Sequence, residues 1–71
     1  MNEELQGKFV ETKRLLQELA AEMGEKLSSR RAHFLAEACF SIWSGEAMPL
    51  LVNDPTGEEA VRRVMALHYT A

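Results

Sequence analysis

The chain has 71 residues, of which 46% are hydrophobic and 27% charged, with a formal net charge of −3 and an isoelectric point near 5.3. This length permits one domain with a modest core, and the composition is typical of a globular chain, not a disordered one. The acidic balance disfavours nucleic-acid backbones and anionic lipid as partners, and the single cysteine excludes an internal disulfide.

The start of the chain lacks the features of a secretory signal. Residues Met1–Glu4 are polar and acidic, whereas such a signal needs a basic start and an apolar run. The longest apolar run, Ala47–Val52, contains Pro49 and is too short to cross a bilayer. We therefore expect a reduced, cytoplasmic setting and no membrane partner.

A long first helix is predicted over residues 3–27, with Asn2 as its N-cap. Apolar side chains recur along it at spacings of three and four, with Thr12 in the gap, which indicates a heptad-like seam. Gly24 could end the helix, but Leu27 keeps the seam in phase, so we extend the helix to residue 27. The seam, for the core or a dimer, consists of Leu5, Phe9, Leu16, Leu19, Met23 and Leu27.

A second helix is predicted over residues 29–44, capped by Ser28 or Ser29 and stopped by Gly45. Trp43 lies at the edge of its apolar stripe and Phe40 lies beyond the edge. The stripe itself consists of Phe34, Leu35, Ala38, Cys39 and Ile42.

The last part of the chain predicts one more helix. Pro49 disfavours a regular helix over residues 46–53, so we expect a turn or a short helical segment there. Thr56 and Glu59 match a capping box, which predicts a third helix over residues 56–69. The fold class is therefore all-α, a small helical bundle with a single domain over residues 1–71.

The expected helix lengths indicate more than one copy of the chain. The first helix would be about 39 Å long and the second about 22 Å, so one end of the seam would stay exposed. Phe40 and Trp43 also require cover on a second side of the second helix. We expect an antiparallel or two-fold homodimer in which the first helix of one chain packs along the other; a monomeric three-helix bundle is the alternative.

Phe40 and Trp43 are the candidate partner-binding aromatics. A tryptophan at the end of a helix is a typical anchor in a protein interface. The alternative is that Trp43 packs against Pro49 and Leu50 as part of the core. Phe40 is the harder of the two to bury, so it is the better indicator of an interface.

Arg30 and Arg31 are candidate contacts for an acidic partner surface. Two cations in a first turn oppose the helix dipole, and such a local penalty can indicate a binding role. The alternative is an exposed pair whose charges are balanced by Glu25 or by the second chain.

The sequence does not indicate catalysis or metal binding. His33, Cys39 and His68 are the residues of metal-ligand or nucleophile type, and their spacing matches no zinc site. Cys39 lies on the apolar stripe and has no base near it in sequence, which indicates a small buried side chain. The glycines form no phosphate loop, and no carboxylate pair is placed in a protected cleft. We expect no enzyme, cofactor, metal or small-molecule substrate.

The function predicted from these features is a non-enzymatic protein–protein interaction module. We favour a small regulator or inhibitor that binds and antagonises a larger protein, with itself as a second partner in the homodimer. One alternative is a structural subunit or small chaperone of a larger complex. Another is a weak DNA-binding regulator whose Arg30–Arg31 and Arg62–Arg63 pairs contact phosphates. No motif is specific enough to indicate a family.

Overall fold

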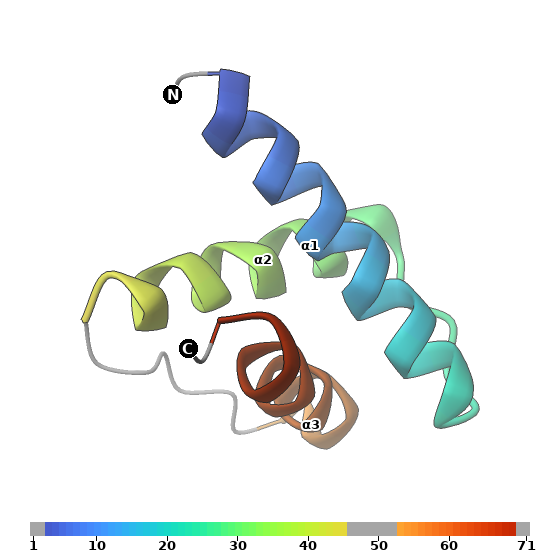
Figure 1. The fold of residues 1–71 in the computed structure, drawn as a ribbon. Coiled ribbons are helices and arrows are strands. Elements are labelled where there is room, and N and C mark those ends of the chain that lie inside the picture. The colour runs from blue at the N-terminus through green and yellow to red at the C-terminus, as the bar shows by residue number, and fades with distance from the viewer. Residues whose placement is uncertain (1–2, 46–52, 70–71) are drawn as a thin grey trace.

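Within the part of the chain that the structure describes, three helices and a short π-helical turn form the fold (Figure 1). No strand occurs in the described ranges, so the predicted all-α bundle is confirmed for them. The turn expected over residues 46–53 lies outside them, except for Asn53, which is in a turn. The structure, a computed structural model, describes residues 3–45 and 53–69 as α1 (Glu3–Glu22), α2 (Ser29–Trp43), α3 (Pro55–Val64) and η1 (Met65–Tyr69).

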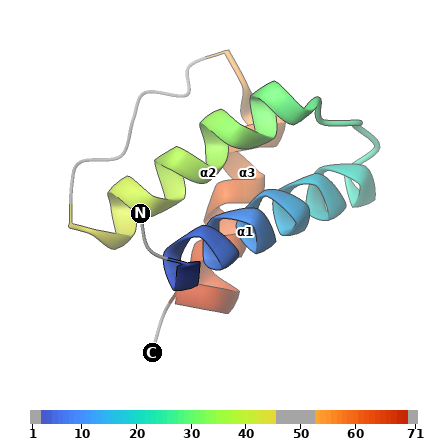
Figure 2. The same cartoon turned by 90° about the horizontal axis from the view of Figure 1, so that it is seen from above.

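The first two helices lie side by side, and the third crosses one face of the pair. α1 and α2 run in opposite directions, and α3 lies beneath both in Figure 2. The Cα radius of gyration is 11.3 Å. A compact chain of this length is expected at about 11 Å, so a single copy closes a core by itself.

α1 ends at Glu22, so its predicted extension to residue 27 is wrong. Gly24 adopts a φ of 86°, and the Glu25 N–H donates to the Ala20 carbonyl at 2.9 Å. The Gly24 N–H donates to the Ala21 carbonyl at 3.0 Å, which completes a Schellman cap. The left-handed conformation of Gly24 therefore ends α1, even though Leu27 continues the heptad spacing. Leu27 is nonetheless buried, because the turn carries it back into the core.

The shorter α1 also reduces the length mismatch from which a dimer was predicted. α1 has 20 residues and α2 has 15. At 1.5 Å per residue these helices are about 30 Å and about 22 Å long, which is a smaller difference than expected. A homodimer therefore needs support from another observation.

The caps of α2 and α3 explain where these helices begin. Ser28 caps α2, and its side chain accepts a hydrogen bond from the Arg31 N–H at 3.1 Å. Asp54, not Thr56, caps α3, because Pro55 is well suited to the first helical position. The Asp54 carboxylate accepts from the Gly57 N–H at 3.0 Å. A β-carbon at residue 57 would overlap that carboxylate, so a larger residue there would force the capping side chain of Asp54 to shift.

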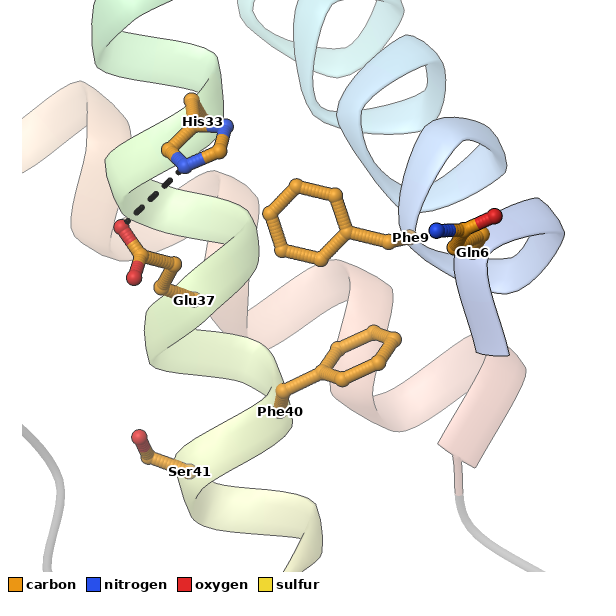
Figure 3. A pocket seen from close by; sticks show the side chains of 6 residues that line it. All are labelled: Gln6, Phe9, His33, Glu37, Phe40 and Ser41. Atoms are coloured by element: carbon orange, nitrogen blue, oxygen red, sulfur yellow. Dashed lines mark ion pairs between the residues drawn. The ribbon is translucent and has the colours of Figure 1, made fainter. Parts of the chain in front are cut away.

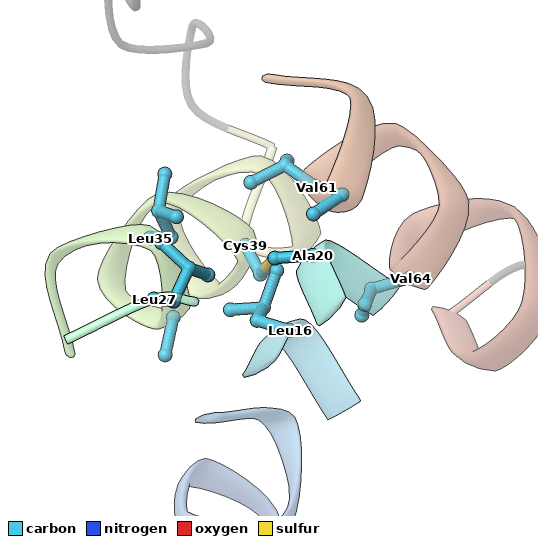
Figure 4. Close-up of a cluster of buried hydrophobic side chains, with 9 residues drawn as sticks. Leu16, Ala20, Leu27, Leu35, Cys39, Val61 and Val64 are labelled. Carbon is cyan, nitrogen blue, oxygen red and sulfur yellow. The ribbon is translucent and has the colours of Figure 1, made fainter. Parts of the chain in front are cut away.

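The core lies where the three helices meet (Figure 4). Of the predicted seam, Leu16 and Leu27 are fully buried, whereas Phe9, Leu19 and Met23 are half-buried against the core. Leu5 is half-buried near the start of α1. Several alanines let the helices approach closely, and the buried cluster consists of Leu16, Ala20, Leu27, Leu35, Ala36, Cys39, Ala60, Val61 and Val64.

Two glycine substitutions should have opposite effects on stability. Gly24→Ala should lower the free energy of unfolding by about 1 kcal/mol, because a β-carbon disfavours positive φ. Gly7→Ala lies inside α1, and outside the local helix backbone no atom lies within 4 Å of the added β-carbon. It should raise the free energy of unfolding by about 0.5–1 kcal/mol. Urea unfolding of both variants measures these changes, and a Gly24→Ala protein as stable as wild type would contradict the assigned cap.

Candidate functional site

A row of aromatic rings runs along the contact between α1 and α2. The Phe9 ring centroid lies 5.0 Å from His33 and 5.3 Å from Phe40, with interplanar angles of 67° and 76°. Phe40 in turn lies 6.0 Å from Trp43 at an angle of 66°. These are edge-to-face contacts, which add stability beyond the apolar area that they bury. We call these four residues the aromatic row.

An open hollow of about 440 Å³ lies over the middle of the aromatic row (Figure 3). Phe9 and Phe40 point toward each other between the helices and provide its apolar surface. α3 passes behind these side chains, so the hollow opens on the face of the α1–α2 pair that α3 does not cover. We call this hollow the groove; it is lined by Gln6, Phe9, His33, Glu37, Phe40 and Ser41.

The polar side chains around the groove include an exposed histidine–glutamate pair. His33 Nε2 lies 3.5 Å from Glu37 Oε1, and both side chains are largely exposed to solvent. An exposed pair of this kind contributes little to stability, and it gives no protected site for acid–base catalysis. The groove can therefore accept an apolar side chain between polar edges.

Trp43 forms a second exposed surface, at the end of α2. Its side chain is 47% exposed, and Lys8 Nζ lies 4.1 Å from the ring centroid. Such a cation–π contact is worth roughly 0.5–1 kcal/mol at an exposed site. Trp43 follows Phe40, a groove residue, by three positions, or about 60° short of a full turn of the helix, and the two rings are in contact. The Lys8–Trp43 surface therefore adjoins the groove at Phe40, although neither Lys8 nor Trp43 lines it.

The two candidate aromatics show the reverse of the predicted order of exposure, because Trp43 is more exposed to solvent than Phe40. Phe40, expected to be the harder to bury, packs half-buried against Phe9, because α1 lies on that side of α2. Phe34 was placed on the apolar stripe of the second helix but is 53% exposed. The proposed alternative, that Trp43 packs on Pro49 and Leu50, involves residues outside the described ranges.

Arg31 joins two parts of the fold and does not lie beside the candidate aromatics. Its guanidinium donates to Glu25 Oε1 at 2.7 Å and to the Asp54 carboxylate that caps α3. It thereby connects the α1–α2 turn to the start of α3. The hydrogen bond from Arg31 is the largest cause that lowers the pKa of Glu25. Arg30 is exposed in the first turn of α2.

Cys39 is a buried structural side chain. Burial raises the pKa of its thiol to about 11, so the thiolate needed for nucleophilic attack is scarce at neutral pH. In the part of the chain that the structure describes, no group of three or more His, Cys, Asp or Glu could hold a metal ion.

Several residues of these surfaces were not predicted as site residues. Gln6, His33 and Glu37 border the groove, and Lys8 covers Trp43, but each is a common polar residue of a helix surface. Val10 is a large apolar side chain of α1 that is 66% exposed. Only the direction from which α2 packs on α1 brings these side chains together, and no sequence spacing specifies that direction.

Comparisons with models of known protein families, with curated protein sequences and with solved structures found no match. Among the helices of residues 3–45 and 53–69, none combines the length and apolar character needed to cross a bilayer.

The Arg31 contacts predict a dependence of stability on pH. Because the pKa of Glu25 is lowered in the folded state, its contribution is present above the ordinary value of 4.5 and is lost as the pH falls through the lower, folded pKa. Arg31→Gln should weaken this acid-dependent loss. Urea unfolding between about pH 6 and about pH 3 measures it. As a control, Arg63→Gln removes only an exposed pair with Glu59 and should behave as wild type; equal acid sensitivity in all three proteins would contradict this role.

Proposed function

We propose that this chain is a non-enzymatic protein-binding module of the cytoplasm, a small regulator that acts as a homodimer and antagonises a larger protein. The observation that carries the proposal is the half-exposed Trp43, held between the Phe40 ring and the Lys8 ammonium. Tryptophan is enriched among the residues that dominate interface energies, and its exposure is unfavourable in a free chain.

The contacts of Trp43 support a preorganised anchor. Phe40 and Lys8 restrict the indole from two directions, so less side-chain entropy remains to be lost on binding. The Lys8 ammonium has three donors and can also bind a carboxylate of the partner. The matching target surface is therefore apolar with an acidic residue at its edge.

Arg30 has a separate part in this proposal. It lies thirteen positions before Trp43, which is about 20 Å along the helix, so the two side chains cannot share one contact point. Lys8 takes the place of the cation expected next to the aromatic anchor. Arg30 contributes only where the interface extends along α2.

Antagonism follows from occupation of the target surface, since a module without chemistry of its own acts by blocking what it covers.

DNA binding is not proposed, because Arg62 and Arg63 pair with Glu58 and Glu59 on α3 at 2.8 and 3.2 Å. These carboxylates would repel the phosphates that the arginines were expected to contact.

Trp43→Ala should abolish capture of the target while the protein stays folded. The matched control is Phe34→Ala, which removes an aromatic side chain of similar exposure from another side of α2. Affinity capture from the native host, followed by mass spectrometry, should recover one specific protein with wild type and with Phe34→Ala only. Circular dichroism checks that each variant keeps its helices.

Two further readouts keep this test decisive. Lys8→Glu should also weaken capture, because it reverses the charge beside the anchor without removing the indole. Trp43 is the single tryptophan, so its fluorescence should shift to shorter wavelength when the captured protein is added. Capture of the same protein by Trp43→Ala, or unchanged emission on binding, would refute Trp43 as the anchor.

A further inference from the structure

We infer that the homodimer forms through the groove, with the α1 helices of the two copies antiparallel across a two-fold axis. This inference rests on the homodimer of the proposed function and specifies its interface. It commits the groove to a second copy of this chain and leaves the Lys8–Trp43 surface for the target.

A stripe of four residues borders the groove on α1. These residues are three, four and three positions apart, so they lie on one face of the helix. One of them lines the groove, and another, Val10, is a large apolar side chain that is 66% exposed. The stripe begins with an acidic residue and ends with a basic one. We call it the α1 stripe: Glu3, Gln6, Val10 and Lys13.

The order of charges in the α1 stripe selects an antiparallel pairing. A two-fold axis midway between Gln6 and Val10 places Glu3 of each copy beside Lys13 of the other. A parallel pairing would place like charges together and would be repulsive. Because a two-fold interface repeats every contact, the pairing forms two ion pairs from one pair of residue types.

Lys13 is able to make this contact. Its ammonium lies 3.5 Å from the Ser29 hydroxyl, which is a long hydrogen bond at an exposed position. An ammonium has three donors, so it can bind a carboxylate of the second copy at the same time.

The same pairing brings an apolar side chain of each copy to the groove of the other. Val10 of the second copy lies opposite Gln6, which lines the groove next to Phe9. The groove measures about 440 Å³ and is floored by Phe9 and Phe40, so it has room for a valine side chain. Each copy thus contributes one protruding valine and one hollow, which is the self-complementary surface that a two-fold dimer requires.

In this pairing, a single type of contact covers both the exposed Val10 side chain and the open groove of each copy. Burial of a valine side chain is favourable because it removes apolar area from water, and the interface would bury two such side chains together with the aromatic floors of both grooves. α3 already covers the other face of the α1–α2 pair (Figure 2), whereas no helix of the described residues covers the groove face, which leaves it accessible to a second copy.

Sedimentation equilibrium of the purified protein over a dilution series tests this interface. Wild type should show a reversible change from a dimer, at twice the chain mass of 8.0 kDa, to the monomer. Val10→Asp should remain monomeric over the same range, because a carboxylate would be buried against Phe9 and Phe40. Leu67→Asp is the matched control, since Leu67 is as exposed as Val10 but lies in η1, away from the stripe, and it should still dimerise.

Charge reversal tests the antiparallel orientation separately. Glu3→Lys and Lys13→Glu should each weaken the dimer by about tenfold, because each change replaces two attractive pairs with two repulsive ones. The double variant restores opposite charges and should recover most of the wild-type affinity. Recovery is expected only if these two residues meet across the interface.

The outcomes distinguish the interface from the proposed function. A wild-type chain that stays monomeric at every concentration would overturn both the dimer and this interface. A wild-type dimer that Val10→Asp leaves intact would overturn this interface alone. A dimer that Val10→Asp breaks, but that the double charge variant fails to restore, would overturn the antiparallel orientation.

Discussion

Two helices packed side by side present two broad faces, and one short third helix covers only one of them. This constraint determines which surfaces of the molecule stay accessible for binding. α3 spans Pro55–Val64 and closes the core against one face of the α1–α2 pair, leaving the other open. The open face carries the groove, whose apolar floor is made by Phe9 and Phe40. The groove and the Lys8–Trp43 surface are the two apolar surfaces for which a binding role is proposed.

The aromatic row joins the groove to the Lys8–Trp43 surface. Phe9 and Phe40 line the groove, whereas Trp43 lies next to Phe40 and beside Lys8, outside the groove lining. A second copy in the groove would therefore leave both indoles of the dimer accessible. Two such anchors on one particle favour a symmetric target, because the second contact is intramolecular once the first has formed. Ordering of Phe40 by the dimer would also stiffen the support of Trp43.

Sequence patterns predicted the helical elements better than their ends and exposed faces. Three helices follow from apolar periodicity and capping residues, and the described structure contains them. The heptad phase at Leu27 was misleading, because the backbone freedom of Gly24 determines where α1 ends. Phe34 and Phe40 could not be assigned correctly, since periodicity shows which residues share a face but not which face the neighbouring helix covers.

The central claim is that the open face of the α1–α2 pair is where this chain associates with itself. Amide chemical shifts recorded by NMR over a dilution series test it residue by residue. The account predicts concentration-dependent shifts at Gln6, Val10 and Glu37, with Arg62 and Arg63 of α3 unchanged. Shifts confined to α3, or spectra that are identical at every concentration, would contradict it.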